Sequence, residues 1–91
     1  MFIMKKVYLS IVIPAYNESK NIMKNILEVD RWVKNNNKYL YEIIVINDGS
    51  TDDTKSILNK TKSSIKTLKV VHHEANFGRG KAIRTGFEHV L

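Results

Sequence analysis

The most informative absences in this 91-residue chain are those of cysteine and of any long apolar segment. Without cysteine, the chain can form neither a disulfide bond nor a thiolate zinc site, which fits a reducing compartment. Its apolar runs have the length of β-strands, far below the roughly 20 residues that a membrane-spanning helix needs. The apolar segment within residues 1–6 is also too short for a signal peptide. These absences favour a soluble, cytoplasmic protein.

Proline and glycine are scarce as well, with one proline and four glycines in the chain. The last three glycines read Gly78-x-Gly80-x5-Gly86, which is neither the G-x-G-x-x-G dinucleotide fingerprint nor a Walker A loop. This spacing argues against NAD binding and ATP hydrolysis. The sequence also contains no Asp-x-Asp pair, a common way to hold a divalent ion against a diphosphate, and no evident serine–histidine–acid arrangement.

The chain does have a basic composition, with a net charge of +6, and 43% of its residues are hydrophobic. That hydrophobic content is enough for one small domain. A basic balance favours anionic partners such as phosphates, nucleic acid or acidic lipid surfaces. The lysines are scattered rather than clustered, however, and a solvated coat on the helices is the simpler explanation.

The apolar pattern predicts three β-strands that alternate with three α-helices. Short β-branched runs typical of strands covered on both faces lie at residues 7–13, 41–47 and 67–73. Apolar residues at three-to-four spacing predict helices that begin near Ser19, after Ser50 and at Lys81. Because crossovers between parallel strands are right-handed, this βαβαβα order predicts an α/β fold. It would be a three-layer, Rossmann-like arrangement with a parallel sheet and helices on both faces.

Several residues mark the expected ends of these elements. Pro14 lacks a backbone N–H and is expected to end the first strand. The asparagines at 35–37 should end the first helix, and Ser50 with Asp53 fits a capping box before the second. No fourth strand is predicted before Leu91, so one sheet edge is expected to be open. Such an edge can pair with another chain, which allows a homodimer.

A polar loop follows each predicted strand, and ligands of open α/β sheets bind beyond the carboxyl ends of the strands. The first loop carries Tyr16, whose ring can stack on a base. Asn17 and Glu18 could hydrogen-bond to the ribose or the base. Strand termination and a favourable position for Glu18 near the positive end of the helix explain the same residues without a ligand.

The second loop is acidic, and its carboxylates are of two kinds. Asp48 stands at the strand end, where it could accept an N–H from a base, and Gly49 permits a positive φ or a close backbone approach. Asp52 and Asp53 belong to the first turn of the next helix, where they complement its dipole and repel phosphate. This loop is therefore expected to hold the base or the ribose rather than a diphosphate.

The third loop is basic. Arg79, Lys81 and Arg84 crowd the start of the last helix, where cations oppose the helix dipole. An anion bound there would explain them, and solvated surface cations are the alternative. His72 and His73 precede this loop, but neighbouring strand residues point to opposite faces, so one metal ion could hardly bind both. One of the two is expected in the core and the other at the surface.

Together, the three loops resemble the inverting glycosyltransferases of family 2, which have the GT-A fold. The matching segments are SIVIPAYNE (10–18), IIVINDGSTDDT (43–54) and NFGRGKAIRTG (76–86). The third segment looks most like the branch of dolichyl-phosphate glucosyl- and mannosyltransferases. The resemblance implies transfer from a UDP- or GDP-sugar, a divalent Mg or Mn cofactor, and a lipid-phosphate or saccharide acceptor. The nucleotide-sugar contacts that it implies, with Asp48 reading the base, are Pro14, Tyr16, Glu18, Ile46, Asp48 and, beside the phosphates, Gly80 and Lys81.

The chain departs from the family pattern at Asn47, where an aspartate is usual, which weakens any claim that this position needs a charge. In family members the Asp-x-Asp metal motif, the acceptor-side residues and the candidate base all follow the point that corresponds to Leu91. The resemblance therefore implies that residues 1–91 are the N-terminal nucleotide-sugar-binding half of a GT-A domain. We assign no catalytic residue and no metal ligand within them, and we expect no turnover from this chain alone. Membrane association is expected, if at all, of the full-length protein.

A non-catalytic α/β module is the alternative function. It would bind an anionic partner through its basic surface, or recruit another chain through the open sheet edge. A steep dependence of binding on salt, without any effect of nucleotides, would distinguish this module from a nucleotide-sugar site. A phosphoacceptor signalling domain fits less well, because the strand-end carboxylates are not placed as a cluster around one acceptor. Nucleic acid is not the partner that the loops favour.

Overall fold

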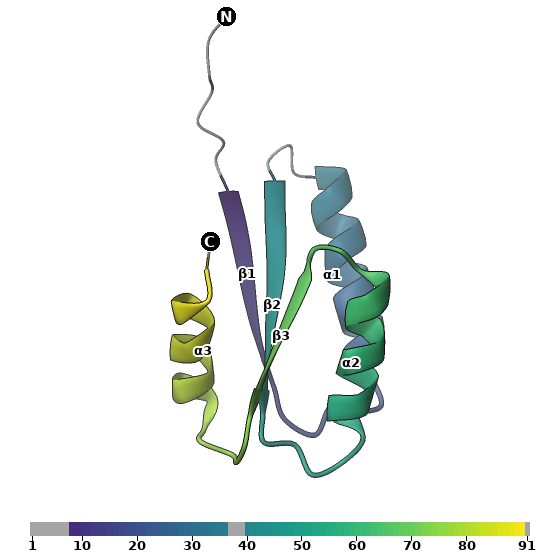
Figure 1. The fold of residues 1–91 in the computed structure, drawn as a ribbon. Helices are drawn as coiled ribbons and strands as arrows, with labels where there is room; N and C mark the ends of the chain where they lie inside the picture. Colours follow the sequence, from purple (N-terminus) through teal and green to yellow (C-terminus); the bar gives the residue numbers. More distant parts are fainter. Residues whose placement is uncertain (1–7, 37–39, 91) are drawn as a thin grey trace, which may run out of the picture.

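A computed structural model describes residues 8–36 and 40–90, which form three parallel strands and three helices (Figure 1). The elements in chain order are β1 (Tyr8–Ala15), α1 (Ile22–Asn36), β2 (Leu40–Asp48), α2 (Thr54–Ser64), β3 (Leu68–His73) and α3 (Arg79–Glu88). The predicted βαβαβα order is confirmed. The expected strand start at residue 7 and the last asparagine of 35–37 lie outside the described residues.

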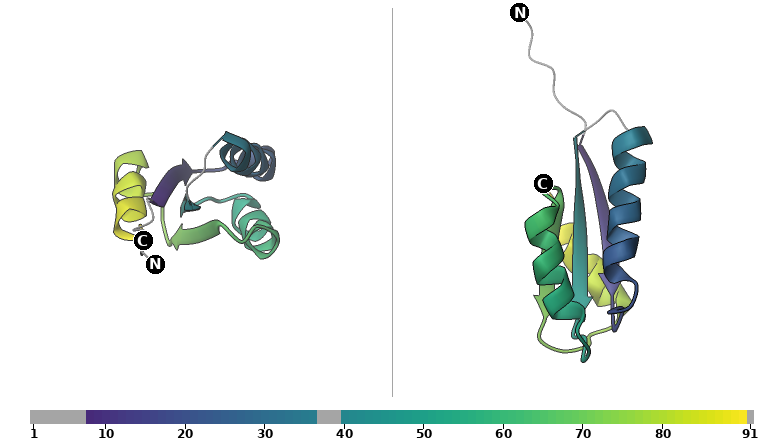
Figure 2. Two further views of the ribbon diagram at one scale, coloured as in Figure 1. Left: turned by 90° about the horizontal axis from the view of Figure 1, so that it is seen from above. Right: turned by 90° about the vertical axis from the view of Figure 1, so that its right-hand side faces the viewer.

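The sheet has the order β1-β2-β3, and its helices lie on both faces. Helices α1 and α2 cover one face, and α3 covers the other (Figure 2). This arrangement confirms the predicted three-layer α/β fold. The parallel register aligns Ala15 with Asn47 and Asn47 with His72, so the carboxyl ends of the three strands lie at the same end of the sheet.

Strand β2 is buried from both sides, which explains its uninterrupted apolar run. Ile43 and Val45 pack in the core under α1 and α2, whereas Ile44 and Ile46 pack with Ala82 of α3. All four of these strand residues are fully buried. Burial of such side chains stabilises the fold by about 1.5–3 kcal/mol each. The same burial fixes the register of β2 and thereby the position of the loop that follows it.

Some element boundaries differ from the prediction. Pro14 does not end β1: it is paired with Ile46 and the strand continues to Ala15. Proline is tolerated there because β1 has a neighbour on one side only among the described strands, and edge strands do not need every N–H. Helix α1 begins three residues after the expected Ser19, and α3 begins two residues before the expected Lys81.

The predicted capping box is wrong. Asp53 is the N-cap residue of α2, but its side chain makes no capping hydrogen bond. The carboxylate of Asp52 accepts the backbone N–H of Thr54 instead, at 2.9 Å. The hydroxyl of Ser50 binds the first loop rather than the helix. Across the described helices, none has the length and apolar character required to span a bilayer.

Candidate functional site

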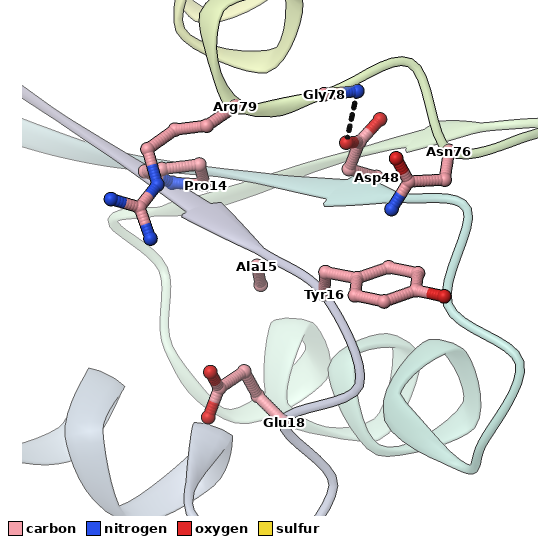
Figure 3. Close-up of a pocket in the computed structure, with 8 residues that line it drawn as sticks. All are labelled: Pro14, Ala15, Tyr16, Glu18, Asp48, Asn76, Gly78 and Arg79. Carbon is pink, nitrogen blue, oxygen red and sulfur yellow. Dashed lines mark hydrogen bonds between the residues drawn. The ribbon is translucent and has the colours of Figure 1, made fainter.

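The three loops meet at the carboxyl ends of the strands around one pocket of about 310 Å³. Its lining residues are Pro14, Ala15, Tyr16, Glu18, Asp48, Asn76, Gly78 and Arg79 (Figure 3). Tyr16 and Asp48, which the sequence placed in two different loops, therefore lie in the same cavity. In Figure 3 the ring of Tyr16 and the amide of Asn76 lie at one side of the pocket, and the guanidinium of Arg79 lies at the other.

Asn17 joins the first loop to the second. It has a positive φ of 51°, a conformation that asparagine tolerates better than most residues. Its backbone N–H donates to Ser50 Oγ at 2.9 Å, and its side-chain Oδ1 accepts the N–H of Thr51 at 2.8 Å. These bonds set the direction in which the chain leaves β1, and so they help to aim Tyr16 at the pocket.

Thr54 makes a second connection between the same loops. It is fully buried, and its hydroxyl accepts the backbone N–H of Glu18 at 2.9 Å while it donates to the carboxylate of Asp52. Asp52 also accepts the N–H of Ser19 at 3.2 Å. Hydrogen bonds from the side chain of Thr54, then from its backbone and from Ser19, lower the pKa of Asp52 to about 2. Asp52 therefore stays ionised and holds the loops together, and it does not line the pocket.

Asp48 joins the second loop to the third. Its Oδ1 accepts the N–H of Phe77 at 2.9 Å and lies 2.8 Å from His73 Nδ1, and its Oδ2 accepts the N–H of Gly78 at 2.8 Å. The residue is only 3% exposed. Burial by itself raises the pKa of Asp48, but the hydrogen bonds from His73, Phe77 and Gly78 outweigh it and hold the pKa below its ordinary value. The carboxylate is thus ionised, and both its oxygens already have donors.

The two neighbouring histidines point to opposite faces of the sheet, as predicted. His73 lies between Asp48 and the hydroxyl of Thr85 on the α3 side, with Nε2 2.9 Å from Thr85 Oγ1. His72 lies on the α2 side between Asn47 and Asn59. The expected division into one core and one surface histidine is wrong, because both side chains are partly buried and each uses both ring nitrogens.

The partners of Asn47 fix the protonation of His72. Asn47 Oδ1 accepts the N–H and the hydroxyl of Ser50, so its Nδ2 donates to His72 Nδ1 at 3.0 Å. His72 Nδ1 is then unprotonated, and Nε2 donates to Asn59 Oδ1 at 2.9 Å. Burial, followed by the charges of Lys55 and Lys62, lowers the pKa of His72 and favours this neutral form.

Three of the residues implied by the resemblance do not line the pocket. The side chain of Ile46 is fully buried in the core under α3, and Gly80 and Lys81 lie in the first turn of α3 outside the lining. The third loop instead contributes Asn76, Gly78 and Arg79, which were not assigned as ligand contacts. The cluster of cations in this loop is apparent from the sequence. Which of them lines the pocket depends on how Asp48 binds the backbone of the loop, and this only the tertiary structure shows.

The pocket does not form a metal site by itself. Within residues 8–36 and 40–90, no three histidine, aspartate or glutamate side chains gather closely enough to hold a metal ion. The carboxylate of Asp48, the most buried acid of the pocket, already accepts hydrogen bonds from three N–H groups. The described residues thus offer no cluster of three such ligands for a divalent ion.

A second hollow, of about 270 Å³, lies near the opposite end of the strands. Its acid, Asp30, accepts the hydroxyl of Tyr41 at 2.6 Å and that of Thr67 at 2.9 Å. These bonds tie α1 to β2 and to the segment before β3, which is a structural role. The pocket at the carboxyl ends is therefore the better candidate site. The fold and the pocket thus define the class of open parallel α/β proteins with a ligand-binding crevice at the carboxyl ends of the strands.

Comparison with known proteins identifies the family. The sequence model of "Glycosyl transferase family 2" matches residues 10–91, and the chain belongs to this family. It is 35% identical over 88 residues to a dolichyl-phosphate beta-glucosyltransferase of Trichomonas vaginalis, covering 92% of this chain and 27% of that protein. It is 42% identical over 87 residues to the protein CsbB of Bacillus subtilis, covering 96% of this chain and 26% of that protein.

A solved structure confirms the fold. The mannosyltransferase PcManGT from Pyrobaculum calidifontis, determined in complex with GDP-Man and Mn²⁺, superimposes with a TM-score of 0.77. The alignment covers 91% of this chain and 24% of that one, at 22% sequence identity. This match confirms the predicted GT-A-like α/β fold, and the family model confirms the predicted family. The chain spans about a quarter of the length of these relatives.

Proposed function

We propose that residues 1–91 form the N-terminal, nucleotide-sugar-binding part of an inverting glycosyltransferase that uses a UDP- or GDP-sugar. Membership of glycosyl transferase family 2 supports this proposal. The observation that carries it is the convergence of Tyr16 and Asp48 on one pocket at the carboxyl ends of β1 and β2. The exposed ring of Tyr16 offers a stacking surface for a base, and Glu18 offers an acceptor for ribose hydroxyls.

The acceptor and the metal of the whole enzyme are part of the same proposal. The dolichyl-phosphate glucosyltransferases among the relatives support a lipid-phosphate acceptor, with a saccharide as the alternative. The Mn²⁺ of the solved mannosyltransferase supports a divalent Mg or Mn ion. When bound, such an ion stabilises the charge of the leaving diphosphate. We propose that the metal ligands and the catalytic base lie in a part of the enzyme that corresponds to the unmatched three quarters of the relatives. We expect no turnover from residues 1–91 alone.

Location and assembly complete the proposal. A soluble nucleotide sugar and a lipid-phosphate acceptor are best served by a cytoplasmic domain that meets the membrane in the full-length protein. Among the described strands, β1 and β3 each have one neighbour, which supports a homodimer through a sheet edge. Gel filtration with light scattering tests the dimer, and a monomer at high protein concentration would refute it.

Binding of nucleotides to the 91-residue chain tests the proposed function. Calorimetry or ligand-observed NMR with UDP, GDP, UDP-glucose and GDP-mannose should show weak but measurable binding. Base stacking on an aromatic ring contributes about 1–3 kcal/mol. Tyr16→Ala should therefore weaken nucleotide binding about 10- to 100-fold, whereas Tyr16→Phe, which keeps the ring, should bind nearly as the wild type does.

Two results of these binding measurements would contradict the proposed function. Equal nucleotide affinity of the wild type and Tyr16→Ala would show that this pocket is not the nucleotide-binding site. Absence of nucleotide binding, together with salt-sensitive binding to anionic vesicles or RNA, would favour the non-catalytic module for anionic partners.

A further inference from the structure

Resting on the proposed function, with Asp48 as the residue that contacts the base, we propose that His73 is a positioning residue for base selection. Held by Thr85, it orients the carboxylate of Asp48 so that one acceptor site of Oδ2 faces the ligand. That acceptor selects a base with a ring N–H at its edge, as in uracil or guanine, over cytosine or adenine. Neither the family resemblance nor the comparisons assign a role to His73 or Thr85.

The carboxylate of Asp48 keeps one acceptor site for a ligand. A carboxylate has about four lone-pair sites, shared equally by its two oxygens. Among the described residues, Oδ1 accepts hydrogen bonds from His73 Nδ1 at 2.8 Å and from the N–H of Phe77 at 2.9 Å, which fill it. Within the same residues, Oδ2 accepts only the N–H of Gly78, at 2.8 Å (Figure 3). Because Asp48 lines the pocket, the second site of Oδ2 is the one that a base can reach.

His73 is the donor to Asp48 that belongs to the sheet. The parallel register of β2 and β3 places these two residues side by side. The other two donors, the N–H groups of Phe77 and Gly78, come from the loop between β3 and α3. The terminal torsion of an aspartate side chain is broad, so a carboxylate held by a loop alone can turn. The bond from His73 therefore fixes that torsion, with Oδ1 toward β3 and Oδ2 toward Gly78.

Two further contacts hold the ring of His73. Its Nε2 lies 2.9 Å from Thr85 Oγ1 of α3, and its ring meets that of Phe77 edge-on, with 5.2 Å between the ring centroids. The side chain of His73 is 9% exposed, and Thr85 is buried. An ionised carboxylate can only accept, so Nδ1 carries the proton in either charge state of the ring. The hydroxyl of Thr85 suits both states, because it can donate to an unprotonated Nε2 or accept from a protonated one.

The ionised state of Asp48 also depends on His73. Burial raises the pKa of Asp48, and the hydrogen bond from His73 is the largest of the effects that lower it. An ionised carboxylate attracts a ring N–H, which uracil has at N3 and guanine at N1. It repels the lone pair of the unprotonated ring nitrogen that cytosine or adenine has at the same place. His73 thus supports both the direction and the charge of the acceptor that the base meets.

Nucleotide binding to the 91-residue chain tests this role. The ratio of the affinities for UDP and CDP, or for GDP and ADP, measures the selection of a ring N–H. The wild type should prefer UDP or GDP within its pair by about 10- to 100-fold, the range for a hydrogen bond to a charged group. His73→Phe keeps an aromatic ring but has no donor. It should lower that ratio to less than about threefold, mainly by weakening binding of the preferred nucleotide.

Two further variants control for packing. His73→Asn can place its side-chain amide where Nδ1 now lies, and it should keep most of the wild-type ratio although it loses the contact with Thr85. His72→Phe makes the same change at the neighbouring residue on the other face of the sheet, and it should keep the ratio within about twofold. A role of His73 in packing alone predicts a loss of stability in His73→Phe with the ratio unchanged, and this result would overturn the inference.

NMR of the wild-type chain tests the same point without a variant that could misfold. The ring nitrogen resonances of His73 should show a protonated Nδ1. The preferred nucleotide should shift the Nδ1 resonance, because the N–H of its base draws on the negative charge of Asp48, and the disfavoured nucleotide of the pair should leave it in place. An unprotonated Nδ1 would overturn the inference. So would an unchanged Nδ1 resonance in the chain saturated with the preferred nucleotide.

The outcomes separate this inference from the proposed function. Nucleotide binding that depends on Tyr16, with no preference within either pair in the wild type, would overturn the inference and leave the proposed function standing. The same holds for a wild-type preference that His73→Phe retains. Failure of the wild-type chain to bind any of these nucleotides would overturn the proposed function, and the inference with it.

Discussion

Gly49 and Ala75 lie in direct backbone contact: a Cβ added to Gly49 would stand 2.2 Å from the carbonyl carbon of Ala75. Gly49 also has a φ of +69°, which turns the chain away from the end of β2. The second loop therefore packs against the third with no room for a side chain. Together with the carboxylate of Asp48, this contact fixes the part of the third loop that carries Asn76 and Arg79.

Substitution of Gly49 tests that contact. Gly49→Ala should lower the free energy of unfolding by at least about 2 kcal/mol, because it combines a left-handed backbone with a clash against the backbone of Ala75. Gly80→Ala is the control, since its Cβ would meet no atom within 4 Å and its φ is not in the left-handed range. Urea denaturation of the two variants should separate them clearly, and equal stability would contradict the close packing.

Gly86 packs α3 against β1. A Cβ at this position would lie 2.2 Å from Cγ1 of Val12. Gly86→Ala should therefore destabilise the chain by about 1–3 kcal/mol despite the better helix propensity of alanine. The double variant with Val12→Ala should be more stable than the sum of the two single effects, with a coupling energy of about 0.5–3 kcal/mol. Strict additivity in thermal or urea unfolding would show that the two residues do not touch.

Thr54 should matter more than another buried threonine of the same helix. Thr54→Val leaves the backbone N–H of Glu18 without its acceptor and should lower the free energy of unfolding by about 1–3 kcal/mol. Thr61→Val is the matched control, because Thr61 is also buried but only donates to the carbonyl of Ile57 within α2. We expect Thr54→Val to weaken nucleotide binding too, since Glu18 lines the pocket. Similar stability losses in both variants would refute the special role of Thr54.

Acid should destabilise the chain through His72. Its pKa in the folded chain lies below the ordinary value of 6.5, so the unfolded chain binds a proton first. The stability that neutral His72 contributes is present above about pH 6.5 and is lost as the pH falls through the folded-state pKa. Unfolding measured between pH 7.5 and 5 should show this loss, and His72→Gln should flatten the profile. A wild-type profile that is no steeper than that of His72→Gln would contradict the assignment.

Replacement of Asn47 should reverse that pH dependence. The amide of Asn47 now donates to Nδ1 of His72 at 3.0 Å. Asn47→Asp puts a carboxylate in the place of that amide. An adjacent negative charge favours the protonated imidazole and raises its pKa. The stability contributed by the pair would then be present below about pH 6.5 and lost as the pH rises through the raised pKa. NMR titration of the His72 ring measures the shift directly, and an unchanged His72 pKa would refute the contact.

The elements of the fold and most of the first two loops were predictable because they depend on local patterns. The alternation of β-branched runs with helical spacing predicted the βαβαβα order. Asp48 ends β2, and Tyr16 and Glu18 follow β1, at the end of the sheet where ligands of such folds bind. The exact ends of the helices and strands could be predicted less well from the sequence. Pro14 stays in β1 because β1 has a neighbour on one side only among the described strands. Asp52 replaces the expected capping residues because Thr54 and Ser19 both donate to it.

By itself, the sequence determined the layered α/β fold, because apolar periodicity and strand order act over short stretches of chain. The motifs in its three loops determined the family. The tertiary structure alone decided which polar side chains face the pocket. Asp48 is turned inward to the third loop, and Arg79 and Asn76 reach the cavity in place of Lys81 and Gly80. The physical reason is that a buried carboxylate must find N–H donors, and those donors come from residues about 30 positions away along the chain.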